Sequence, residues 1–187
     1  FGVPYAHGIN EEVLTVKNSP RFIQVVSCNT HTISRLIKSI APGLDSDLVS
    51  GDFVCIRRAN DASQDSGFTP SPTCGKHSDD VFGTHHARDV HDLFSTVANP
   101  DWDLTSSAMK VNSQYMHVVR FQIKIKEKDV DLPTVQSRLK EDQFISTTKH
   151  MTANKVFSFG RDHGFYGRIY NQAVVCEPSL QVINRGP

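Results

Sequence analysis

The sequence predicts an α+β fold: a mostly antiparallel or mixed sheet with helices packed on one face. Residues 116–126 alternate between apolar and polar side chains, which is typical of a strand with one buried and one solvated face. Residues 31–40 place apolar side chains three and four positions apart, which is the spacing of a helix. A parallel dinucleotide-binding fold is not expected, because no Gly-x-Gly-x-x-Gly turn follows a first strand.

Length and composition describe one globular domain spanning residues 1–187. The chain has 187 residues, of which 38% are hydrophobic and 21% charged, and this is enough to build one sizeable core. The 20 basic and 20 acidic residues cancel, and no basic face stands out, so we expect neither nucleic acid nor a membrane surface as a partner. No apolar run approaches the length of a transmembrane helix.

The cysteines indicate a reducing compartment. Four cysteines are scattered along the chain without a Cys-x-x-Cys pair, which favours a cytoplasmic protein with free thiols. Cys55 and Cys176 each lie in an apolar run, so we expect both thiols to be buried in strands.

The first half of the chain centres on an apolar run that leads into the helical pattern. The apolar part of residues 22–30 predicts a strand, and the helix over 31–40 ends at Ala41-Pro42-Gly43, where Pro and Gly stop it. A second strand is expected over 53–58. Residues 62–83 are rich in Ser, Pro, Gly and Asp and predict a long loop.

The second half mixes short helices with strands around the alternating segment. We expect a short helix ending at Phe94, a polar turn at 99–107, a helix at 133–141, a strand at 143–147 and a helix at 153–161. Two final strands, 169–176 and 180–183, are expected to pair with each other around Glu177-Pro178.

Cys28 lies where the predicted strand turns into the predicted helix. Ser27, Asn29 and Thr30 offer side-chain oxygens that cap the free amides of a helix start. These amides and the positive end of the helix dipole favour a thiolate, which is what a nucleophile requires. The alternative is a small apolar residue in a tight turn.

His117 lies near the start of the alternating strand. It has the same parity as Val119 and Phe121, so we expect it on the covered face of the sheet. Pattern alone leaves two interpretations open: a hydrogen-bonded core histidine or a site residue.

Several short motifs occur together in one order. They are Val25-Val26-Ser27-Cys28-Asn29-Thr30, Ile56-Arg57-Arg58-Ala59, His85-His86-Ala87-Arg88-Asp89-Val90 and Met116-His117-Val118, with Gly8-Ile9-Asn10 upstream and Phe159-Gly160-Arg161-Asp162 and Glu177-Pro178-Ser179 downstream. In this combination the chain resembles the archaeal-type (type II) glyceraldehyde-3-phosphate dehydrogenases over nearly its whole length.

The resemblance implies a reaction and its catalytic pair. Cys28 would add to an aldehyde as a thiohemiacetal, hydride transfer to NAD or NADP would give a thioester, and inorganic phosphate would release an acyl phosphate. His117 matches the family's catalytic base. The chemistry asks independently for an ionised thiol and for a base that titrates near neutral pH.

The resemblance also implies the binding residues and the assembly. Ser27, Asn29, His85 and His86 match substrate-binding positions for a phosphorylated aldehyde, and Arg58 matches an arginine next to the cofactor. A homotetramer is implied for the full-length enzyme, and no metal is implied.

Three departures from the family pattern matter. Val119 stands where the family has a second histidine, and Ser66–Pro72 replaces a Gly-Pro-Ile-Asn stretch, which leaves the phosphate contacts open. The N-terminal nucleotide-binding domain and the C-terminal segment that packs on it have no counterpart in the chain. We therefore expect residues 1–187 to be the catalytic domain, a fragment of a longer enzyme.

Other functions compete with this interpretation. A zinc site is one, since Cys74, His77, His85, His86 and His91 crowd one region. A second is a non-catalytic interaction subunit that kept the catalytic-domain fold. A third is another aldehyde dehydrogenase or acyl-transfer enzyme on the same scaffold.

Overall fold

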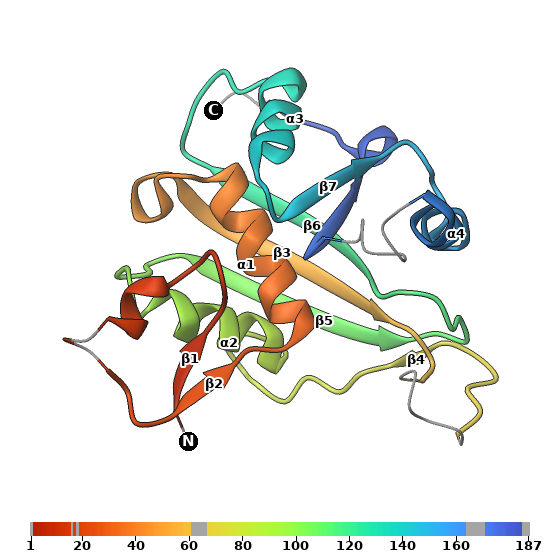
Figure 1. Ribbon diagram of the computed structural model, residues 1–187, viewed down its shortest axis with the longest axis horizontal. Helices are drawn as coiled ribbons and strands as arrows, with labels where there is room; N and C mark the ends of the chain where they lie inside the picture. The colour runs from red at the N-terminus through yellow and green to blue at the C-terminus, as the bar shows by residue number, and fades with distance from the viewer. Residues whose placement is uncertain (1, 16, 18, 61–66, 164–170, 185–187) are drawn as a thin grey trace.

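The computed structural model describes residues 2–15, 17, 19–60, 67–163 and 171–184. Its elements are β1 (Val3–Tyr5), η1 (Glu11–Leu14), β2 (Ile23–Val25), α1 (Cys28–Ile40), η3 (Leu44–Ser46), β3 (Leu48–Arg57), β4 (Thr73–Cys74), α2 (His85–Phe94), β5 (Asp103–Lys110), β6 (Val118–Ile125), α3 (Leu132–Glu141), β7 (Ile145–Thr148), α4 (Ala153–His163), β8 (Ala173–Cys176) and η5 (Glu177–Ser179). The predicted α+β class is confirmed: α1 and α2 lie over one face of a central sheet (Figure 1).

The central sheet is mixed and has the strand order β4-β5-β3-β6. β3 pairs in parallel with β5 and antiparallel with β6, so that Phe53 faces Ser106 on one side and Phe121 on the other. The predicted alternation holds in β6, where Val119, Phe121 and Ile123 contact the core and the intervening side chains are exposed. Two small parallel sheets, β1-β2 and β7-β8, complete the fold.

Helix α1 lies between two hydrophobic clusters and belongs to both. Ile33 and Ile37 contact the cluster that contains Phe53. Leu36 and Ile40, one step round the helix, contact the cluster that also contains Leu139. These four apolar side chains of the predicted helix are all buried, and they contribute to two cores, so α1 joins the two halves of the domain.

A buried ion pair fixes α1 to the C-terminal half. The guanidinium of Arg35 donates to the carboxylate of Asp142, just after α3, and also to the carbonyl oxygen of Gly8. Asp142 further accepts from the Ser39 hydroxyl and from the Phe144 N–H. Burial raises the pKa of Asp142, but these hydrogen bonds and the Arg35 charge outweigh it and hold the pKa below its usual value.

The turn at Gly8 requires a residue without a side chain. Its φ is +79°, and a Cβ would lie 2.6 Å from the Phe144 ring and 2.8 Å from the Arg35 guanidinium. Two residues later, Asn10 is fully buried: its amide donates to the Pro4 carbonyl oxygen at 2.9 Å and to the Thr96 hydroxyl at 2.8 Å. The N-terminal segment is therefore attached to both α1 and the end of α2.

Two predictions about strands were wrong. Residues 99–107 were expected to form a polar turn, yet β5 begins at Asp103 and occupies an interior position of the sheet. β8 pairs in parallel with β7 rather than with residues 180–183, which form no strand in the described structure. Residues 169 and 170 of the expected strand lie outside the described residues.

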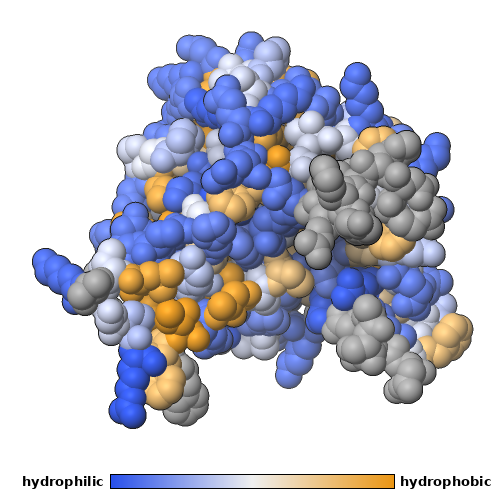
Figure 2. All heavy atoms as spheres, viewed as in Figure 1, coloured by the Kyte–Doolittle hydropathy of each residue, from blue (hydrophilic) through white to orange (hydrophobic). Residues whose placement is uncertain are grey.

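Apolar side chains gather on one surface, over β1 and β2 (Figure 2). Phe22 is 63% exposed and Val25 is 72% exposed, with Ile23 between them also exposed. The apolar run therefore forms a strand as predicted, but its side chains face solvent. Within the described residues, no helix is long and apolar enough to cross a membrane.

Loss of the Arg35–Asp142 pair should account for much of the stability that the domain loses at acid pH. We expect Asp142→Asn to lower the free energy of unfolding by about 3–5 kcal/mol, because it leaves the Arg35 charge buried without its partner. Since the folded-state pKa of Asp142 is lowered, its contribution is present above the unfolded pKa and is lost as pH falls below about 4. Urea unfolding across that pH range measures both effects.

The control is Glu127→Gln, which breaks the partly exposed pair with Arg138. It should cost less than about 1 kcal/mol. An Asp142→Asn variant as stable as the parent protein, with the same dependence on pH, would contradict the assignment.

Candidate active site

Cys28 is the first residue of α1, as the sequence predicts. Ser27 caps the helix: its hydroxyl oxygen accepts from the Thr30 N–H at 3.3 Å and shares a 2.8 Å hydrogen bond with the Thr30 hydroxyl. The cap satisfies one of the first N–H groups of the helix, and Cys28 is exposed. A thiol at this position lies at the positive end of a 13-residue helix.

Asn29 connects this helix start to α2. Its side-chain amide nitrogen lies 3.2 Å from Nε2 of His86, and both residues are buried. The two candidate residues are 57 positions apart in the chain, and the fold brings them into direct contact. This hydrogen bond holds the start of α1, which carries Cys28, against the start of α2, which carries the two histidines.

The two histidines occupy different environments. His85 is exposed, whereas His86 is 4% exposed and their rings lie 4.0 Å apart between centroids. The pKa of His86 is lowered to about 4, mainly by burial and in addition by the nearby charges of His85, Arg57 and His117. His86 is therefore neutral at physiological pH.

A buried chain of hydrogen bonds holds the neutral His86 ring. Nδ1 lies 3.1 Å from the Thr84 hydroxyl, which lies 2.6 Å from the Ser106 hydroxyl on β5. Ser106 in turn accepts from the Ala87 N–H at 3.0 Å, and so satisfies a free amide in the first turn of α2. Since a neutral imidazole carries one N–H, His86 donates through one nitrogen and accepts at the other.

His117 lies just outside the strand in which the alternation placed it. β6 begins at Val118, and Met116 has a φ of +54°, so the chain turns before the strand starts. His117 is half-buried, and its Nδ1 accepts a hydrogen bond from the Arg58 N–H at 3.1 Å. The Arg58 guanidinium donates to the carbonyl oxygen of Asn60 at 2.9 Å.

Electrostatic influence links these groups at one end of the sheet. The charges of Arg57 and His117 both act on His86. On the other side, burial raises the pKa of Cys55 to about 11, with Arg57 opposing the rise and Cys28 adding to it. Because such effects fall with distance, the end of β3 and the start of β6 lie near the starts of α1 and α2.

The proposed zinc cluster is not assembled. No group of three His, Cys, Asp or Glu side chains that could hold a metal ion occurs among the residues the structure describes. Instead the structure adds residues that sequence reasoning passed over: Thr84 and Ser106 behind His86, and Arg57 beside it. The tandem Arg57-Arg58 was a visible signal for the last; nothing local marked Ser106.

Comparison with known proteins gives distant relatives. The chain is 26% identical over 171 residues to a glyceraldehyde-3-phosphate dehydrogenase of Methanocaldococcus jannaschii, covering 87% of this chain and 46% of that protein. It is 28% identical over 142 residues to a glyceraldehyde-3-phosphate dehydrogenase of Archaeoglobus fulgidus, covering 68% of this chain and 38% of that protein. No protein-family model matches the chain. The aligned part thus spans less than half the length of these relatives.

The lowered pKa of His86 has a direct test by NMR. Its ring signals should not titrate between pH 5.5 and 8, taking these bounds as about one and a half units above the folded pKa and one and a half above the unfolded one. Because the folded pKa is about 4 and the unfolded value 6.5, His86 contributes stability above pH 6.5 that is lost as pH falls toward 4. A His86→Gln variant assigns the signal, and the same ring in urea gives the unfolded reference. Titration of His86 near pH 6.5 in the folded protein would overturn the assignment.

Proposed function

We propose that this chain supplies the catalytic half of a phosphorylating aldehyde dehydrogenase. The reaction is oxidation of glyceraldehyde 3-phosphate to 1,3-bisphosphoglycerate with inorganic phosphate. The observation that carries the proposal is the exposed Cys28 thiol at the start of α1, with its neighbour Asn29 bonded to His86. Distant similarity to two archaeal enzymes of that name supports it.

Cys28 is the nucleophile in this proposal. Its thiolate attacks the carbonyl carbon of the aldehyde, and the carbonyl electron pair moves to oxygen. The thiol lies at the N-terminal, positive end of the α1 dipole, where it is open to a substrate. Cys55 does not compete, because it is fully buried and its pKa is raised to about 11.

His117 acts on the oxygen of the adduct. Its Nδ1 accepts from the Arg58 N–H, so a neutral ring carries its proton on Nε2. In that form His117 donates a hydrogen bond that stabilises the alkoxide, which leaves the oxygen electron pair free to form the thioester carbonyl. The family resemblance assigns His117 as the base that takes the proton from this oxygen. Here His117 acts on the same oxygen, but through Nε2 as a hydrogen-bond donor, because Nδ1 already accepts from the Arg58 N–H.

Substrate and cofactor contacts complete the proposal. Ser27, which precedes Cys28, and His85, which precedes His86, are both exposed and open to a substrate, while buried His86 holds Asn29. The Arg58 N–H donates to His117, which places Arg58 at the edge of the site. This position suits a residue that lies beside the cofactor. NAD or NADP supplies the hydride acceptor when bound.

The reverse half-reaction tests the nucleophile without a cofactor. An acyl phosphate such as acetyl phosphate should transfer its acyl group to the Cys28 thiolate and release inorganic phosphate. Peptide mapping after brief exposure near neutral pH should find the acetyl group on Cys28, and not on buried Cys55. Exposed Cys74 reports the background reaction of an ordinary thiol.

The matched variant is Cys28→Ser, which should lose the acetyl group while keeping the fold. Joined to a nucleotide-binding domain, the same variant should lose dehydrogenase turnover. Equal labelling of Cys28 and Cys74 would instead favour the non-catalytic interaction subunit.

A further inference from the structure

We propose that Met116 is a positioning residue for His117. Its left-handed backbone turns the chain so that the His117 ring accepts from the Arg58 N–H and keeps Nε2 for the oxygen of a Cys28 adduct. This inference rests on the proposed function, which gives His117 that task, and it assigns no chemistry to the Met116 side chain.

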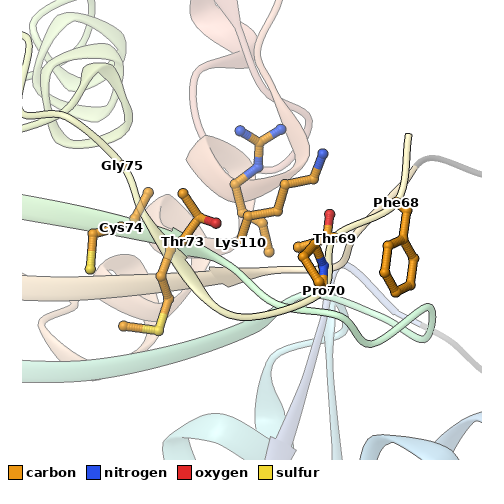
Figure 3. A pocket seen from close by; sticks show the side chains of 10 residues that line it. Phe68, Thr69, Pro70, Thr73, Cys74, Gly75 and Lys110 are labelled. Atoms are coloured by element: carbon orange, nitrogen blue, oxygen red, sulfur yellow. The ribbon is translucent and has the colours of Figure 1, made fainter. Parts of the chain in front are cut away.

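The loop of residues 111–117 crosses the end of β3. β5 and β6 pair with opposite edges of β3, so the chain passes over the last residues of β3 on its way from one to the other (Figure 1). It leaves β5 at Lys110, which is paired with Arg57 and Thr73 and lines a hollow of about 250 Å³ with both (Figure 3). The sheet thus fixes where the loop begins.

Two backbone hydrogen bonds attach the first half of this loop to the end of β3. The Val111 N–H donates to the Arg57 carbonyl oxygen at 2.9 Å. The Ala59 N–H donates to the Ser113 carbonyl oxygen at 2.8 Å. These bonds hold residues 111–113, and the remaining four residues carry the chain to the start of β6.

The hydrogen bond between these two ends on a side chain. The Arg58 N–H donates to Nδ1 of His117 at 3.1 Å, and His117 directly precedes β6, which starts at Val118. Side chains of a regular strand stand roughly perpendicular to the sheet. The His117 ring instead reaches along the sheet to the backbone that continues β3. The chain therefore leaves the strand conformation before His117.

Met116 is the residue at which the chain turns, and its conformation is sterically unfavourable. Its φ is +54°, in the left-handed region, where Cβ comes too close to the following carbonyl oxygen. Such strain persists only where surrounding contacts impose it, and it is concentrated at functional sites. Among the described residues, the other non-glycine residues with positive φ are Leu44 and Asp129, and neither is adjacent in sequence to a candidate site residue.

Both neighbours of Met116 are held, which explains why the strain falls on it. On one side, the Tyr115 ring lies 4.9 Å from the Phe157 ring of α4, measured between centroids. On the other side, His117 is bonded to Arg58. The change of direction between these two contacts is taken up by the residue that joins them.

The turn serves the reaction through the orientation of one ring. The Arg58 N–H on Nδ1 selects the neutral tautomer that carries its proton on Nε2. A donor stabilises a developing oxyanion most when it is held in place before the reaction begins. Met116 therefore contributes geometry, and His117 contributes the hydrogen bond.

Two variants that both lack the Met116 side chain separate backbone from side chain. Valine is β-branched and resists a positive φ, whereas asparagine tolerates it. Acetyl transfer from acetyl phosphate to Cys28 passes through an oxyanion, so it should be at least about tenfold slower in Met116→Val. It should stay within about twofold of the parent rate in Met116→Asn. Iodoacetamide reacts by displacement of iodide without an oxyanion, so Cys28 should be alkylated equally fast in both variants.

Asp129→Val is the matched control. Asp129 also has a positive φ, of +64°, but it is exposed and lies in the segment between β6 and α3. The variant creates the same backbone conflict away from the site and should change neither rate. Met116→Ala and Met116→Gly repeat the comparison with smaller side chains, since glycine adopts the left-handed conformation freely, so the test does not depend on one variant folding.

NMR of the His117 ring nitrogens tests the geometry without any reaction. At a pH where the ring is neutral, the parent protein and Met116→Asn should show the Nε2–H tautomer, and Met116→Val a mixture of both tautomers. An unchanged tautomer in Met116→Val, or equal slowing of acetylation and alkylation, would overturn the role of Met116. A changed tautomer with unchanged acetylation would confirm that Met116 orients the ring and contradict the role proposed for His117 in the reaction.

Discussion

The Arg35–Asp142 ion pair is the constraint on which the remaining geometry depends. It joins α1 to the segment after α3, and through the Gly8 carbonyl it also holds the N-terminal turn. α1 contributes side chains to both hydrophobic clusters, so packing on two sides and the Arg35 ion pair in its middle together fix the position of the helix. Ser27 sets Cys28 as the first residue of α1, and these contacts fix where that helix start lies in the domain.

Around the proposed nucleophile, rigidity comes from neutral hydrogen bonds. The chain from Ser106 through Thr84 and His86 to Asn29 crosses from β5 to α2 to α1 without a formal charge. Charge is concentrated further out, where Arg57 and Lys110 end their strands. The structure thus separates a neutral hydrogen-bonded framework that joins α1, α2 and β5 from the cations at the ends of β3 and β5.

Local pattern predicted much of this, and failed where long-range contacts decide. The strand-to-helix join at Cys28 and the alternation of β6 follow from short-range rules, and both were confirmed. β5 was missed because Thr105, Ser106 and Ser107 are typical of a turn. Ser106 is nevertheless buried in the sheet, where its hydroxyl accepts a hydrogen bond from the Ala87 N–H in the first turn of α2. The alternation placed His117 within the strand, whereas β6 begins at Val118 after a turn at Met116, which no periodicity encodes.

The turn at Gly8 has a consequence for inherited variation. Any β-carbon there would act as a wedge, pushing the aromatic ring of Phe144 and the guanidinium of Arg35 apart. Because Arg35 lies on α1, displacing its side chain would disturb the helix that begins at Cys28. A substitution at Gly8 would therefore impair the candidate site although Gly8 is not part of it, because its effect is a steric displacement of α1.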